Sequence, residues 1–131
     1  ELVSSGSGRA DGGRGEVGRR GEDMAAERLA NRGYRIIERN FRTREGEVDL
    51  IAWDGPVLAF IEVKARRGRA YGLPEESITA TKSKRLIAVA YAYMQEMDEP
   101  PEDWRIDAVA IEFGMGHALR RFDVIKGAVE G

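Results

Sequence analysis

Apolar positions in this chain change from helical spacing to strand spacing and back, which predicts two helices and five strands. The first helix is expected from Glu16 to Arg32, where the apolar residues follow a helical period, and Gly33 ends the pattern. A second helix is expected to begin between Ser77 and Thr81 and to run to about Met97. Runs typical of strands are Tyr34–Arg39, Glu47–Trp53, Val57–Ala65, Arg105–Phe113 and Leu119–Ile125.

The order α-β-β-β-α-β-β predicts an α/β fold in which helices flank a mixed five-stranded sheet. The third strand shows no alternation from Val57 to Val63, so we expect it to be buried on both faces at the centre of the sheet. Residues 1–15 are rich in Gly, Ser and Arg and are expected to be disordered, with residues 16–131 forming a single domain.

The Asp54-Gly55 pair between the second and third strands predicts a two-residue hairpin turn. A turn formed by these two residues would pair Trp53 with Pro56, and therefore Asp49 with Phe60. The carboxylate of the second strand would then share a face with the charges of the third strand.

Those charges are Glu62 and Lys64, and both lie within apolar, strand-forming sequence. In the expected register Asp49 and Glu62 are diagonal neighbours, roughly 7–8 Å apart at the backbone. A shift of one residue would move Glu62 and Lys64 to the opposite face. Buried charges destabilise a fold unless they are paired, hydrogen-bonded or bound to a metal, so three of them close together indicate a site.

Carboxylates are hard oxygen ligands that suit Mg²⁺ or Mn²⁺, and the carbonyl of Val63 could supply a third oxygen. Such an ion could polarise a phosphoryl oxygen and activate water, while Lys64 stabilises negative charge. The competing interpretation is an ordinary ion pair between Glu62 and Lys64 on a half-exposed strand.

Composition narrows the possibilities further. The chain has 131 residues, of which 42% are apolar and 34% charged, and it has a net charge of −2. It contains no cysteine, which removes disulfides, thiolate zinc sites and cysteine nucleophiles, and no apolar stretch approaches the ~18–20 residues of a membrane span. No signal peptide is visible, so a cytoplasmic location without a membrane partner is expected.

Two motifs together carry a resemblance to a known family. They are Gly46-Glu47-Val48-Asp49-Leu50-Ile51-Ala52 and Phe60-Ile61-Glu62-Val63-Lys64-Ala65-Arg66. The pair resembles the PD-(D/E)xK restriction-endonuclease-like superfamily, and more narrowly the YraN (UPF0102) family, which is similar to archaeal Holliday junction resolvases. Further matching motifs are Arg20-Gly21-Glu22, Gly33-Tyr34, Asn40-Phe41-Arg42, Gly72-Leu73-Pro74, Lys82 and Arg105-Ile106-Asp107.

The resemblance implies a three-layer α/β/α restriction-endonuclease-like core and a divalent metal. It places Asp49, Glu62 and Lys64 in the catalytic positions, with Glu22 on the first helix beside the metal. An acid near a helix N-terminus also stabilises the helix dipole, which is the alternative role for Glu22. The final-strand Arg-x-Asp pattern could map to Asp107 or to Asp123, and its position after the second helix favours Asp107.

Basic residues near this site are candidates for phosphate contacts, with a solvated surface as the alternative. They are Arg66, Arg67, Lys82, Lys84 and Arg42. Glu47 shares the expected face of Asp49 and is a candidate second-sphere acid.

The function expected from these features is metal-dependent hydrolysis of phosphodiester bonds. DNA is favoured over RNA, and structure-selective action on junctions, flaps or ends is favoured because no separate recognition motif is present. The resemblance also implies a homodimer. The alternative is a nucleic-acid-binding or scaffold module that kept the fold with little or no turnover.

Overall fold

The structure is a computed structural model that describes residues 15–68 and 72–129. The expected disordered segment, residues 1–15, therefore lies outside the described residues except for Gly15. The elements are α1 (Gly15–Asn31), β2 (Arg35–Thr43), β3 (Gly46–Asp54), β4 (Val57–Arg67), α2 (Ala80–Gln95), β5 (Asp103–Phe113) and β6 (Leu119–Val129), with short 3₁₀ turns η1 (Pro74–Ser77) and η2 (Met115–His117). This order matches the one that the sequence predicts.

The sheet has the strand order β2-β3-β4-β5-β6, so the chain adds each new strand beside the previous one. Neighbouring strands are antiparallel except for β4 and β5, which are parallel and are connected through α2. The parallel pair needs such a crossover because its strands start at the same edge of the sheet. The mixed five-stranded sheet and the central place of β4 are both confirmed.

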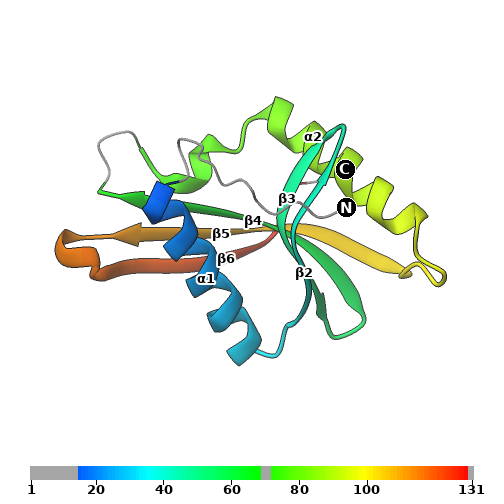
Figure 1. The fold of residues 1–131 in the computed structure, drawn as a ribbon, viewed down its shortest axis with the longest axis horizontal. Helices are drawn as coiled ribbons and strands as arrows, with labels where there is room; N and C mark the ends of the chain where they lie inside the picture. The colour runs from blue at the N-terminus through cyan, green and yellow to red at the C-terminus, as the bar shows by residue number, and fades with distance from the viewer. Residues whose placement is uncertain (1–14, 69–71, 130–131) are drawn as a thin grey trace.

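The two helices cover opposite faces of the sheet, which gives three layers (Figure 1). On one face, Ala25 and Leu29 of α1 pack on a cluster that includes Leu50, Ile61 and Ile111. On the other face, the α2 stripe packs on Ile51, Phe60 and Ile106, and it comprises Leu86, Val89, Ala90 and Met94. Alternate residues of the central strands thus enter different clusters, which explains their nearly continuous apolar sequence.

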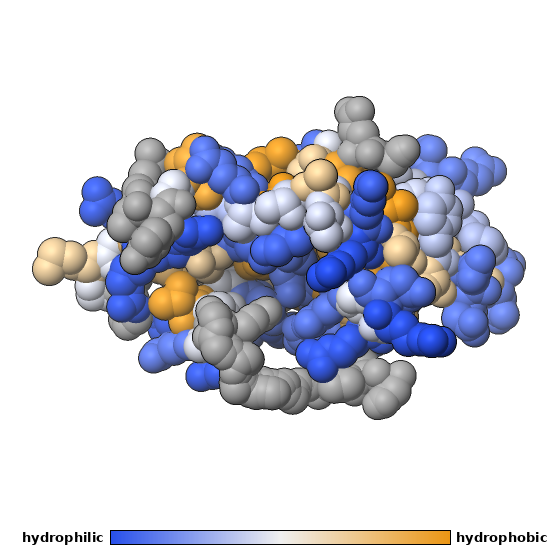
Figure 2. Space-filling view, turned by 90° about the horizontal axis from the view of Figure 1, so that it is seen from above, coloured by the Kyte–Doolittle hydropathy of each residue, from blue (hydrophilic) through white to orange (hydrophobic). Residues whose placement is uncertain are grey.

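Hydrophilic side chains dominate the molecule when it is seen from above (Figure 2). None of the helices found in residues 15–68 and 72–129 is long and apolar enough to cross a membrane.

Helix α1 approaches β4 most closely at Gly21. A Cβ atom added there would lie 2.6 Å from the Cβ of Ala65, closer than two carbon atoms can pack. The hydrogen side chain of Gly21 therefore sets the depth at which α1 sits on the sheet.

Replacing Gly21 with alanine is expected to destabilise the fold by about 1–3 kcal/mol, because the helix must shift away from Ala65. At an exposed helical position the same change would stabilise by about 1 kcal/mol. Urea denaturation measures the change in unfolding free energy, and its sign shows whether the contact with Ala65 or the helix propensity of alanine has the larger effect. A stabilised variant would show that α1 moves off the sheet without loss.

The hairpin that joins β3 and β4 differs from the predicted one by two residues. Asp54 pairs with Val57, so Gly55 and Pro56 form the loop in place of Asp54 and Gly55, and the predicted pairing of Trp53 with Pro56 is wrong. The positive φ of Gly55, 61°, fits the tight turn. A register shift of two residues, unlike a shift of one, leaves every side chain on its predicted face.

Two strands are longer than the sequence indicates. β2 continues beyond Arg39 to Thr43, and Asn40 within it has a positive φ of 54°. β6 continues beyond Ile125 to Val129 and keeps pairing with β5, since Val129 lies opposite Ile106.

A buried polar network closes the edge of the sheet where β5 begins. The carboxylate of Asp107 has no exposed surface and accepts hydrogen bonds from Arg105 Nε at 2.8 Å and from the Gly127 amide at 3.0 Å. Arg105 also pairs with Asp54 at the β3–β4 turn and donates to the Tyr34 hydroxyl. The network therefore ties the ends of three strands to the loop that follows α1.

Candidate functional site

The centre of the candidate site is the carboxylate of Asp49 in the middle of β3. Its side chain is buried, with 4% of the residue exposed, and its Oδ2 accepts a hydrogen bond of 2.7 Å from the Val63 backbone amide in β4. The observed register, continued past the Leu50–Ile61 pair, places Asp49 directly opposite Glu62. The predicted pairing of Asp49 with Phe60 is therefore wrong, and the two carboxylates face each other directly.

Glu62 occupies a strongly perturbed environment. Burial and the nearby charge of Asp49 raise the pKa of Glu62 to about 8, although Lys64 acts in the opposite direction. A hydrogen bond joins the Glu62 and Asp49 side chains, and the Lys64 ammonium lies 3.0 Å from Glu62 Oε2. Near neutral pH the Glu62 carboxyl therefore keeps its proton.

These contacts settle one question about the local geometry. Asp49 and Glu62 do not point to opposite faces of the sheet, as a purely structural Glu62–Lys64 pair would allow. The side chain of Glu62 is only 14% exposed, so this ion pair is not an ordinary half-exposed surface contact.

Replacing Glu62 with glutamine is expected to stabilise the protein in a chelating buffer. The folded-state pKa of Glu62 is raised to about 8 from an ordinary value of 4.5, so its favourable contribution is complete at acid pH and is lost as the pH rises through 8. The gain from the substitution is expected to be on the order of 2 kcal/mol at pH 8, because the Lys64 pair offsets part of the repulsion.

The measurement is urea denaturation of both proteins between pH 4.5 and pH 8.5. Glu27→Gln, a change at an exposed position of α1, is the matched control. The difference in unfolding free energy between this variant and the parent protein should be the same at every pH. A Glu62→Gln variant that parallels the parent protein at every pH would contradict the raised pKa.

Several positively charged side chains lie on the α2 side of Glu62. The side chain of Thr79 caps α2 by accepting a hydrogen bond from the Lys82 amide, which fixes where the helix begins. The pKa of Lys82 is lowered, mainly by the charge of Lys64 and then by burial, with a further contribution from Arg66. These three cations repel one another, and such a cluster is suited to binding an anion.

Glu22 lies on α1, where it is buried. Its neighbour Gly21 lies against Val63 and Ala65, which alternate with Glu62 and Lys64 along β4, so α1 covers the opposite face of this stretch of the strand. Within the described ranges, no three His, Cys, Asp or Glu side chains form a group that could hold a metal ion. Glu22 therefore does not complete a three-carboxylate set with Asp49 and Glu62 in this geometry.

The remaining candidates lie farther from the buried carboxylates. Arg42 and Glu47, on paired positions of β2 and β3, form an ion pair with each other at 3.3 Å. Lys84 is exposed on α2. Arg67 ends β4 and is exposed at the mouth of a pocket.

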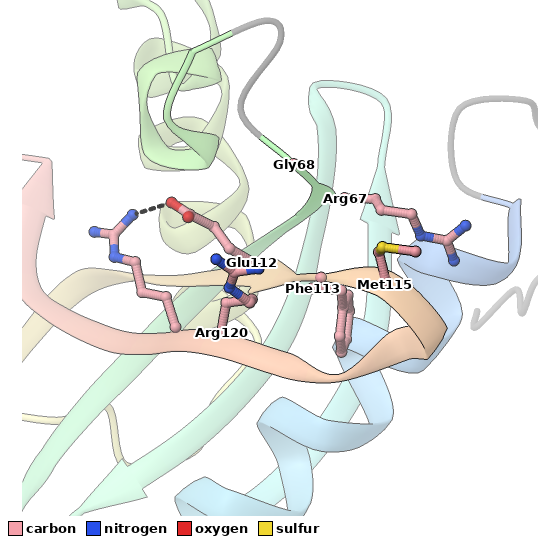
Figure 3. A pocket seen from close by; sticks show the side chains of 8 residues that line it. Arg67, Gly68, Glu112, Phe113, Met115 and Arg120 are labelled. Carbon is pink, nitrogen blue, oxygen red and sulfur yellow. Dashed lines mark hydrogen bonds and ion pairs between the residues drawn. The ribbon is translucent and has the colours of Figure 1, made fainter.

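That pocket has a volume of about 620 Å³, and the sequence analysis did not identify it. Its lining comprises Arg67, Gly68, Glu112, Phe113, Gly114, Met115, Arg120 and Arg121. It forms where the end of β4 meets the β5–β6 hairpin (Figure 3). The sequence signal that could have found it is the Arg120-Arg121 pair, which directly follows the glycine-rich turn.

Comparison with known proteins identifies the family. The model of the uncharacterised protein family UPF0102 matches residues 21–126, which include Glu22, Asp49, Glu62 and Lys64. A UPF0102 protein of Symbiobacterium thermophilum is 52% identical over 104 residues, covering 79% of this chain and 88% of the relative. A UPF0102 protein of Anaeromyxobacter dehalogenans is 44% identical over 114 residues, covering 87% and 85%. The chain therefore belongs to the UPF0102 family.

Proposed function

We propose that this protein is a metal-dependent endonuclease that hydrolyses phosphodiester bonds in DNA. The observation that carries the proposal is the buried Asp49–Glu62 pair with Lys64 at 3.0 Å from Glu62. Holding two carboxylates together away from water opposes folding, and a raised carboxyl pKa is characteristic of functional sites. The resemblance of the two motifs to PD-(D/E)xK nucleases supports the same reaction.

The donor set fits a small divalent cation. Asp49 and Glu62 supply adjacent carboxylate oxygens, and the Val63 carbonyl lies between Glu62 and Lys64 on β4. Mg²⁺ is usually held by one or two carboxylates and completes its shell with water and phosphate oxygens, so a third protein carboxylate is not required. Mn²⁺ accepts the same ligands.

A bound cation would polarise a phosphoryl oxygen and lower the pKa of a water ligand. The chain itself contributes the positions of the surrounding groups. The Val63 amide holds Asp49 Oδ2 in place, and Lys64 carries positive charge to the position where negative charge develops on the phosphate. We assign Glu22, on α1, an assisting role. We assign Glu47 the role of a more distant, second-sphere acid.

The substrate class follows from the cations. Lys64 and Arg66 both lie close enough to Lys82 for their charges to interact with it, and Lys82 and Arg66 are suited to contact backbone phosphates on either side of the bond that is cut. Such contacts carry no base sequence. We therefore propose selection by DNA structure, at junctions, flaps or ends, by a homodimer whose two sites address two strands.

Cleavage of a labelled panel tests the proposal. The panel holds a four-way junction, a flap, a single strand and a linear duplex, with Mg²⁺, Mn²⁺ or EDTA. Cleavage that needs the metal and disappears in Asp49→Asn is the expected result. Asp23→Asn, which removes an exposed acid on α1, is the matched control and should cleave like the parent protein.

A second function, nucleic-acid recognition without turnover, has one observation in its favour. Asp49 and Glu62 satisfy each other through a shared hydrogen bond, and Glu62 is also paired with Lys64, so the group is stable without a metal. Metal-independent binding of the panel without cleavage, equal in the parent protein and in Asp49→Asn, would establish this function and refute the nuclease.

A further inference from the structure

The pocket at the β5–β6 hairpin differs from the candidate catalytic site in place and in chemistry. Three arginines line it, and its one acidic residue is Glu112. Arg67 lies three residues beyond Lys64 on β4, about 10 Å along the strand. The pocket and the buried carboxylates therefore occupy successive positions along the same strand.

Arg121 has a structural role in this pocket. Its guanidinium binds Glu112 Oε2 at 2.9 Å, Glu75 Oε2 of η1 at 2.7 Å and Asp123 Oδ2 at 2.8 Å. These three contacts neutralise Arg121 and fix the position of the Glu112 side chain, which lines the pocket. The positive charge that the β5–β6 hairpin presents to a ligand in this pocket is therefore that of Arg120.

Arg120 is exposed and forms no ion pair within the part of the chain that the structure describes. Its side chain crosses the backbone at Gly114, where an added Cβ would lie 2.6 Å from Arg120 Cδ. The absence of a side chain at Gly114 thus allows Arg120 to reach the pocket. Figure 3 shows Arg120 beside Glu112 and Arg67 beside Met115, at the two ends of the pocket.

Met115, at the tip of the hairpin, is 90% exposed. The turn is tight, because the Gly114 amide binds the Ala118 carbonyl at 2.6 Å and Gly116 takes a positive φ of 63°. A large apolar side chain on a rigid tip between cations resembles the wedges that proteins insert between base pairs of bent DNA.

We propose that this pocket is a second phosphate site for the DNA strand, and that Met115 inserts at a break in base stacking beside it. Arg120 binds a backbone phosphate a few nucleotides from the bond that is cut. The wedge favours DNA whose bases are already unstacked, such as a branch point, because unstacking an intact duplex opposes insertion. The choice of DNA as ligand depends on the proposed function.

Binding measurements test this site without any turnover. The parent for the test is the Lys64→Ala protein in EDTA, and fluorescence anisotropy gives its affinity for a flap and for a linear duplex at several salt concentrations. The flap carries 2-aminopurine at the branch, where unstacking raises its fluorescence.

In this background Arg120→Gln is expected to weaken binding to both DNAs several-fold and to reduce the salt slope by about one unit. Gly114→Ala, which keeps the charge but displaces the Arg120 stem, is expected to weaken binding to both DNAs as well. Met115→Ser is expected to keep the salt slope, to lose the preference for the flap and to abolish the 2-aminopurine signal. Lys126→Gln removes a charge from the far end of β6 and should leave binding unchanged.

An unchanged salt slope in Arg120→Gln would overturn the phosphate site, and an unchanged 2-aminopurine signal in Met115→Ser would overturn the wedge. These outcomes are independent of catalysis. Cleavage by the unmodified protein, together with normal binding by both variants, would refute this site and leave the nuclease intact. The expected binding results without any cleavage would leave the site standing and refute the nuclease.

Discussion

Replacing Asp107 with asparagine is expected to lower the free energy of unfolding by about 3 kcal/mol, which corresponds to a fall in melting temperature of roughly 10 °C. Asp107 has no exposed surface, and its carboxylate holds Arg105, the Gly127 amide and the Tyr34 hydroxyl together. Asparagine has nearly the same shape but carries no charge. Among the residues that the structure describes, Arg105 would keep only Asp54 as a counter-ion inside a partly buried network.

The chain contains its own control for this change. Arg121 and Asp123 repeat the Arg-x-Asp spacing on β6 with a similar distance, 2.8 Å, but the side chain of Asp123 is 55% exposed. Asp123→Asn is expected to change stability by less than about 0.5 kcal/mol, because solvent screens the pair. Equal losses in the two variants, measured by thermal and urea unfolding, would show that burial does not set the strength of these pairs.

Replacing Lys64 with alanine is expected to reduce cleavage by about 10²–10³-fold while divalent metal still binds. The Lys64 ammonium group brings positive charge to the phosphate without ligating the cation, so its removal acts mainly on the developing phosphate charge. It also repels a bound cation, and metal affinity is therefore not expected to fall. Asp49→Asn should differ by losing cleavage and metal binding together.

Single-turnover cleavage of the preferred panel substrate and calorimetric titration with Mn²⁺ separate these two effects. Lys126→Ala, which removes an exposed lysine of β6, is the matched control for charge. Cleavage by Lys64→Ala at the parental rate would remove Lys64 from the mechanism. Loss of metal binding in Lys64→Ala would show that the lysine positions the ligands instead.

The sequence predicted the fold well because the elements are separated by clear spacing. The lack of apolar–polar alternation from Val57 to Val63 correctly identified β4 as the central strand, since a strand covered on both faces buries consecutive residues. The turn was the weak point. Asp54-Gly55 has the composition of a two-residue loop, but Asp54 instead pairs with Val57, and its carboxylate binds Arg105 far along the chain. A contact between distant residues cannot be inferred from local spacing.

The candidate site was predicted only as far as it depends on local spacing along the chain. Asp49, Glu62 and Lys64 come together because all three lie on one hairpin, where register is a local property. The pocket of Arg67, Arg120 and Met115 was missed because it joins β4 to a hairpin nearly fifty residues later through the parallel pairing. The position of Glu22 depends on how deeply α1 packs, which Gly21 sets through a contact with Ala65.

The one parallel pairing in the sheet also has a consequence for the order of assembly. The β3–β4 and β5–β6 hairpins join neighbouring segments, whereas β4 and β5 meet only after α2 has crossed over, so their pairing closes the longest loop and is expected to form late. Asp49 and Glu62 can therefore approach each other in water on an early hairpin. They lose that water only when β5 docks and α2 covers the sheet. The electrostatic repulsion between Asp49 and Glu62 thus acts on the slow, long-range step of folding. The same two carboxylates therefore affect both the chemistry of the site and the rate at which the chain folds.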